Sequence, residues 1–215
     1  MAKIIFTPFS VREAGQLANR LEYSDRIQEG MAADKTGHRG FKRNFGSSEV
    51  KYAPLQQNTG QLAHLTGPDD QLYINAHCAA GFDFVANREK VDEPGAKQVN
   101  IETLIRYLKW HNLPETTKCK IKLWICEGGL DGAGGKPSFA KLFSAGMHEA
   151  GYKLCRIFGY AQSLLAQYER VEEPVAGSAK PKVNFHKMAV LDHGKPRTRA
   201  SSPDVRKEFF NGQMI

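Results

Sequence analysis

The apolar residues of this chain fall into short runs that alternate with amphipathic segments. Runs of strand length lie at 3–9, 72–78, 118–126 and 153–160. Apolar residues recur at helical spacing in 11–30, 100–112, 138–152 and 161–169. Two late runs, 183–192 and 204–211, again have strand character. Strands that alternate with helices predict an α/β fold with three layers: a mostly parallel sheet that carries helices on both faces.

The helical pattern is clearest between the second and third strands. Ile101, Leu104, Ile105 and Leu108 follow the i, i+3, i+4, i+7 spacing of one helix face, and Asn100 is a suitable N-cap. A helix between two strands is the crossover that parallel neighbours require. We therefore expect the strands at 72–78 and 118–126 to lie side by side, with their carboxyl ends at one edge of the sheet.

Two stretches break the alternation. Residues 31–70 are rich in Gly, Lys, Asn and Gln, with only a short strand at 49–55, and predict a surface insertion. Residues 174–215 begin with a Pro, Ala, Gly and Lys linker and form a basic C-terminal segment. A chain of 215 residues suits one core, so we expect a single domain over 1–215.

Composition excludes several classes of protein. No apolar stretch approaches the roughly 18 residues that a membrane span needs, and the N-terminus lacks the layout of a signal peptide. We expect a cytoplasmic protein, or one that is secreted or translocated without a recognisable cleaved signal. Four cysteines are too few for a disulfide scaffold. Cys119 and Cys155 lie within strands and are expected in the core.

The net charge of +7 raises the question of an anionic partner. Basic residues gather at 34–43 and at 186–207, but neither cluster is interleaved with the aromatic residues of a single-strand stacking platform. This pattern disfavours nucleic acid and favours solvated faces. An anionic activator at the basic surface stays open as a second interpretation.

Two strands end at residues capable of nucleophilic chemistry. His77 ends "LYINAH" and Cys126 ends "IKLWIC". Chemistry in open α/β sheets gathers at the carboxyl ends of the strands, so the predicted neighbours bring imidazole and thiol together. The imidazole can take the thiol proton and later protonate a leaving amine. Backbone N–H groups in the glycine-containing turn after Cys126, with Gly128 and Gly129, can stabilise an oxyanion.

This arrangement resembles the caspase-like superfamily of cysteine peptidases, which includes caspases, clostripain and gingipain relatives and the autoprocessing domains of large bacterial toxins. The histidine precedes the cysteine by 49 residues, each ends an apolar strand, and the cysteine opens a Cys-x-Gly turn. The resemblance covers roughly residues 70–160. It implies an endopeptidase that cleaves proteins or peptides, in the style of bacterial effectors or self-processing enzymes, with His77 as base and Cys126 as nucleophile.

The resemblance also assigns the oxyanion donors to the backbone N–H groups of Cys126 and of the residue after the histidine. That residue is usually glycine in the family and is Cys78 here, so its N–H persists but glycine's conformational freedom does not. Cys78 suggests a further hypothesis, a reversible disulfide with Cys126 under mild oxidation.

Two other functions compete with a peptidase. The loop 127–138 nearly spells a phosphate-binding P-loop, but Leu130 stands at its first glycine and Pro137 at its hydroxyl position. A non-catalytic adaptor that binds anions through the basic tail is the third interpretation. We expect no cofactor and no metal, because the six other histidines show no ligand spacing with the cysteines: His38, His64, His111, His148, His186 and His193.

Overall fold

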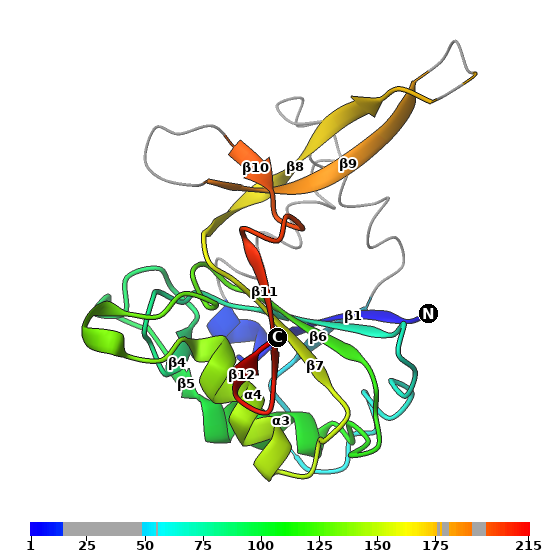
Figure 1. The fold of residues 1–215 in the computed structure, drawn as a ribbon. Coiled ribbons are helices and arrows are strands. Elements are labelled where there is room, and N and C mark those ends of the chain that lie inside the picture. The colour runs from blue at the N-terminus through cyan, green and yellow to red at the C-terminus, as the bar shows by residue number, and fades with distance from the viewer. Residues whose placement is uncertain (15–48, 55, 176, 178–180, 191–196) are drawn as a thin grey trace.

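A computed structural model of the chain describes residues 1–14, 49–54, 56–175, 177, 181–190 and 197–215. Its centre is a seven-stranded sheet in the order β12-β11-β7-β6-β3-β1-β2 (Figure 1). The strands are β1 (Lys3–Thr7), β2 (Glu49–Tyr52), β3 (Gln71–Asn75), β6 (Lys120–Trp124), β7 (Arg156–Tyr160), β11 (Arg206–Phe210) and β12 (Gln213–Met214).

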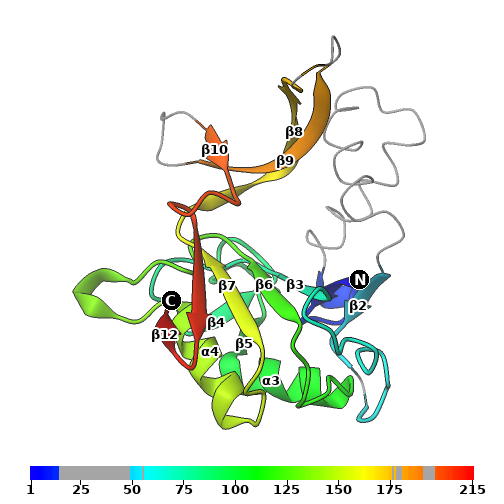
Figure 2. The same cartoon turned by 45° about the vertical axis from the view of Figure 1, so that its right-hand side comes forward.

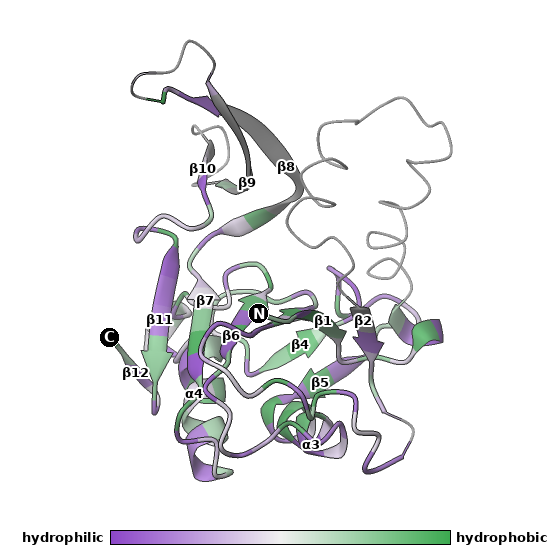
Figure 3. Cartoon of the chain, turned by 90° about the vertical axis from the view of Figure 1, so that its right-hand side faces the viewer, coloured by the Kyte–Doolittle hydropathy of each residue, from purple (hydrophilic) through white to green (hydrophobic). Residues whose placement is uncertain are grey.

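The sheet is mostly parallel. β2, β1, β3, β6 and β7 run in the same direction, while β11 pairs antiparallel with both β7 and β12. The two central strands β3 and β6 alternate buried and half-buried residues, as their sequences predict, whereas β11 changes from hydrophilic to hydrophobic along its length (Figure 3). The predicted α/β class is confirmed.

Two helices cover one face of the sheet (Figure 1). They are α3 (Ile101–Trp110) and α4 (Phe139–Glu149), and a short 3-10 turn, η2 (Ala133–Gly135), precedes α4. The Asn100 side chain accepts a hydrogen bond from Thr103 N at 2.9 Å, so the predicted N-cap of α3 is confirmed. Between these helices and the sheet lies the core, built on fully buried residues such as Leu72, Leu104 and Phe143.

The sequence predicts helices on both faces of the sheet, but α3 and α4 pack against the same face. From the other side rises a separate antiparallel sheet of three strands (Figures 1 and 2). Its strands are β8 (Ser163–Glu173), β9 (Lys182–Val190) and β10 (Arg197–Arg199). Tyr160 and Leu164 pack at its base with Ala189 and Val205.

The predicted helix at 161–169 is wrong, because this segment belongs to β8. Apolar residues there recur at helical spacing, but the backbone pairs with β9 along most of the strand. Tertiary pairing overrides local pattern in such a short segment. The late strands predicted at 183–192 and 204–211 are confirmed as β9 and β11.

Residues 49–54 and 56–70, the described part of the predicted surface insertion, are packed into the fold. β2 pairs parallel with β1, and Leu62 and Leu65 are fully buried in the core. The polar composition of this segment gave no sign that these two leucines are buried. Of the helix predicted over 11–30, residues 11–14 are helical and the remainder lies outside the described residues. Residues 31–48, which include the basic cluster 34–43, lie outside them too.

The stretch 81–100 contains strands that the sequence analysis did not predict. The structure has a two-stranded sheet there, β4 (Phe84–Ala86) with β5 (Gln98–Asn100). Within the described residues, no helix is long and apolar enough to pass through a bilayer.

Candidate active site

The register of β3 and β6 aligns the two predicted catalytic residues. The last pair of this parallel ladder is Asn75 with Trp124, an offset of 49 residues. His77 and Cys126 have the same offset, so each lies two residues past that pair, beyond the end of its strand. Adjacent strands are about 4.8 Å apart, so the two residues follow neighbouring strand ends at the carboxyl edge of the sheet.

Both candidate residues directly follow a buried core residue. Ala76 and Ile125, the residues immediately before them, are buried in the core on the helix side. Continued alternation past the strand ends would direct His77 and Cys126 away from the core. The approach of imidazole and thiol stays a prediction, with which the register of β3 and β6 agrees.

The backbone of His77 is held by an isolated bridge to the end of β4. His77 N donates to Ala86 O at 2.8 Å, and Ala86 N donates to His77 O at 2.9 Å. The residue is 8% exposed. Beside it lies a cavity of about 230 Å³ that Phe82 and Val91 also line. A buried, doubly bonded backbone limits the positions that the imidazole can take.

The sulfur of Cys126 contacts the first residues of β8. Leu164 N donates to Sγ at 3.4 Å, and Sγ lies 4.0 Å from Leu164 O. A thiolate can accept the first of these hydrogen bonds, so the backbone at Leu164 is suited to stabilise negative charge on the sulfur. Sequence reasoning missed this contact, because it interpreted the segment as a helix and no side-chain signal marks a backbone donor.

The turn after Cys126 depends on its two glycines. A Cβ on Gly128 would lie 2.5 Å from the Ile125 side chain, and a Cβ on Gly129 would lie 2.8 Å from the backbone of Gly159. Gly129 N donates to Tyr160 O at 2.9 Å, which ties the turn to β7. Gly128 and Gly129 therefore let the chain leave β6 in close contact with its neighbour.

Glu127, a residue that sequence reasoning did not select, links three segments at the site. It adopts a left-handed conformation with φ of 54°. Its carboxylate accepts hydrogen bonds from Ala80 N at 3.4 Å and from the Ser163 hydroxyl at 3.1 Å. The loop after His77, the turn after Cys126 and the start of β8 thus share one acidic side chain. The only sequence signal was its position directly after the nucleophile.

The loops after β3 and β6 also meet through their backbones. A Cβ on Gly81 would lie 2.6 Å from Gly132 Cα, and Gly81 N donates to Leu130 O at 3.3 Å. Only the absence of side chains permits this approach. The two strand ends are consequently connected by direct contact of their loops as well as by the sheet.

Cys78 does not need the conformational freedom of glycine. Its φ is not among the positive values of the described residues. Its thiol lies 3.4 Å from Ala79 O and 3.7 Å from Phe84 O and packs against the core. Burial raises the pKa of Cys78 to about 12, with smaller contributions from Cys126 and Glu127. The side chain is a protonated, structural thiol.

Groups within the loop 127–138 accept hydrogen bonds from the N–H groups at the start of α4. Asp131 accepts a hydrogen bond from Ser138 N at 2.7 Å, and Gly128 O accepts one from Ala140 N at 2.7 Å. Those N–H groups open α4, where a P-loop would bind phosphate. A carboxylate and a carbonyl already take these donors, which weakens the nucleotide-binding interpretation.

The remaining cysteines and histidines supply no second centre. Cys119 and Cys155 are buried in the core, as predicted, and none of the four cysteines forms a disulfide. In the described part of the chain, no group of three or more His, Cys, Asp or Glu residues has metal-binding geometry. The basic C-terminal segment contributes strands to the seven-stranded and the three-stranded sheet. Its Arg199 forms an ion pair with Glu173 at 2.8 Å.

Comparison with known proteins adds no relative. No protein-family model matches the chain, and a search of curated proteins finds no match.

Proposed function

We propose that the chain is a caspase-like cysteine peptidase that cleaves proteins or peptides through His77 and Cys126. The observation that carries the proposal is the register of β3 and β6, because the same offset of 49 residues, continued past the strand ends, aligns His77 with Cys126. Order along the chain, strand ends and the glycine turn agree with it. The contact from Leu164 N to the sulfur and the linked loops supply the supporting structure.

The chemistry proceeds in two halves. His77 takes the Sγ proton, and the thiolate forms a bond to the substrate carbonyl carbon, with the N–H groups of Cys78 and Cys126 as the proposed oxyanion donors. Collapse of this intermediate breaks the C–N bond as the imidazolium protonates the leaving amine. Water, deprotonated by His77, then attacks the thioester, which releases the acid product and restores the thiol.

Loss of either dyad residue is expected to abolish cleavage without unfolding the protein. The test compares Cys126→Ala and His77→Ala with wild type, by incubation with a proteome and mapping of new N-termini. His64→Ala, a change at an exposed histidine, is the matched control and retains activity. Circular dichroism is the check that the variants are folded. Full cleavage by either dyad variant would refute the assignment.

A direct test of the nucleophile needs no substrate. Iodoacetamide at neutral pH should alkylate Cys126 faster than the other three cysteines, and His77→Ala should slow that reaction. Peptide mapping by mass spectrometry measures both rates. Equal alkylation of Cys126 in wild type and His77→Ala would show that the imidazole does not activate the thiol.

A further inference from the structure

Two of the buried cysteines lie beside each other where neighbouring strands begin. Cys119 directly precedes β6 and Cys155 directly precedes β7, and the first pair of this parallel ladder is Lys120 with Arg156. The cysteines continue that register by one residue, and Arg156 N donates to Cys119 O at 3.4 Å. Neighbouring strands are about 4.8 Å apart, which is inside the range of roughly 4.4–6.8 Å between the Cα atoms of a disulfide.

The two side chains meet inside the core. Cys119 is fully buried, Cys155 is 4% exposed, and both belong to the apolar cluster that packs between the sheet and the helices. The Cys155 thiol donates a hydrogen bond to the Cys119 sulfur, which lowers the pKa of Cys119 and raises that of Cys155. Register and hydrogen bond together place the two sulfurs within reach of each other without any movement of the backbone.

The other two cysteines are at the opposite edge of the sheet. Cys78 and Cys126 follow the carboxyl ends of β3 and β6, and the Cys126 sulfur accepts a hydrogen bond from Leu164 N. A strand of five residues is roughly 16 Å long, which separates these two thiols from Cys119 and Cys155 by far more than a disulfide can span. The fold therefore selects one partner for Cys119.

We propose that Cys119 and Cys155 are the site of a disulfide bond that joins β6 to β7. The oxidant is a low-molecular-weight disulfide such as oxidised glutathione, which reacts while the chain folds, because the folded core excludes it. The Cys119 thiolate attacks one sulfur of the oxidant, forms a mixed disulfide and releases one small thiol. Cys155 then loses its proton and attacks the Cys119 sulfur, which forms the S–S bond and releases the second small thiol. Two protein thiols are oxidised and one small disulfide is reduced.

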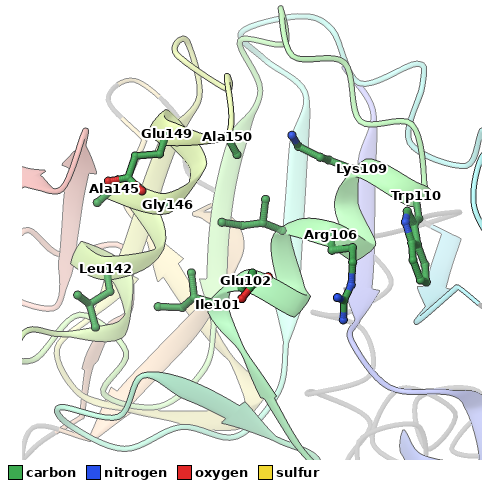
Figure 4. A pocket seen from close by; sticks show the side chains of 11 residues that line it. Ile101, Glu102, Arg106, Lys109, Trp110, Leu142, Ala145, Gly146, Glu149 and Ala150 are labelled. Carbon is green, nitrogen blue, oxygen red and sulfur yellow. The ribbon is translucent and has the colours of Figure 1, made fainter.

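The disulfide would close a loop of residues 119–155 that contains β6, Cys126 and α4. In the folded protein α4 is already held against α3 at Gly146, where a Cβ would lie 3.2 Å from the Ile101 side chain (Figure 4). The cross-link restricts the unfolded chain and leaves this packing as it is, so the oxidised protein should melt roughly 5–10 °C above the reduced one. The bond forms at the edge of the sheet opposite His77 and Cys126, so the inference does not depend on the proposed function.

Refolding of the full chain provides the test. The protein is unfolded in urea with reductant and refolded in two ways, with a mixture of reduced and oxidised glutathione or with dithiothreitol. Free thiols are then alkylated in urea, and the protein is digested without reductant. Mass spectrometry should find the peptides of Cys119 and Cys155 linked after the glutathione refolding only. Thermal melts of the two preparations measure the stabilisation, and Cys155→Ala, the matched control, should show neither the linked peptide nor the difference in melting temperature.

The outcomes decide the proposal. A linked peptide together with the higher melting temperature supports the disulfide. Alkylated Cys119 and Cys155 after refolding with the glutathione mixture would overturn it, whatever the Cys155→Ala variant does. A linked peptide in a protein that melts at the same or a lower temperature than the reduced form would also overturn it, because the bond then does not fit the folded register of β6 and β7.

Discussion

Lys122 is an unusual lysine, and its replacement by methionine should stabilise the protein at neutral pH. It lies half-buried on the sheet face away from the helices. Its ammonium donates to Gln71 Oε1 at 2.8 Å and to the Tyr73 hydroxyl at 3.1 Å. Burial, with the positive charges of Arg206, Lys3 and Lys120, lowers the pKa of Lys122 from 10.5 to about 8.

The sign and size of the effect follow from linkage. A folded-state pKa below the unfolded value means that protonation disfavours folding, fully below pH 8, and that this cost disappears as the pH rises through 10.5. The difference between the folded and unfolded pKa of Lys122 destabilises the folded protein by about 3 kcal/mol at pH 7 and by about 1 kcal/mol at pH 10. Methionine removes this cost and loses two hydrogen bonds worth about 1 kcal/mol each. We expect a net gain of about 1 kcal/mol at pH 7.

Urea denaturation of wild type and Lys122→Met between pH 7 and pH 10 measures the prediction. The difference in unfolding free energy between the two proteins should change by about 2 kcal/mol over this range, as the wild type gains stability relative to the variant. Lys118→Met, at an exposed lysine, is the matched control and should show no such change. Parallel pH profiles for wild type and Lys122→Met would show that the ammonium is well solvated and that the reasoning is wrong.

Three further predictions test the packing and the thiols. Leu62→Ala should cost about 2–5 kcal/mol in urea denaturation, since the side chain is fully buried, whereas a change of less than 1 kcal/mol would return this segment to the surface. Gly129→Ala should lower the melting temperature sharply, because its Cβ would lie 2.8 Å from Gly159; a normal melting curve would show that the turn can move away. Mild peroxide should leave Cys78 outside any disulfide with Cys126, since a thiol of pKa about 12 is a poor resolving nucleophile, and a linked peptide in a non-reducing map would restore the redox hypothesis.

The sequence predicted those parts of the fold that local pattern determines. β3 and β6 alternate apolar and polar residues, and α3 has both its cap and its apolar stripe. Those three elements suffice to predict parallel neighbours and the position of His77 and Cys126 at one edge. The candidate site was predictable because it depends on strand ends, which the hydrophobic pattern marks.

The remaining features depend on contacts between distant segments. β8 has helical spacing, and only its pairing with β9, which sequence reasoning could not foresee, makes it a strand. Leu62 and Leu65 are isolated apolar residues in a polar stretch, without a period that marks burial. Glu127 acts through a backbone N–H 47 residues earlier, at Ala80, and no local pattern records such a contact.

The alignment of His77 with Cys126 has a consequence for evolution and engineering. It is maintained by the ladder between β3 and β6, whereas the number of residues between them depends only on the length of the crossover through β4, β5 and α3. Insertions in exposed parts of that crossover, such as the turn around Glu115 and Thr116, can lengthen the interval and leave the two strand ends where they are. Distant homologues are therefore better sought by strand ends and their order than by a fixed interval, and a tag or sensor peptide placed in that turn should be tolerated.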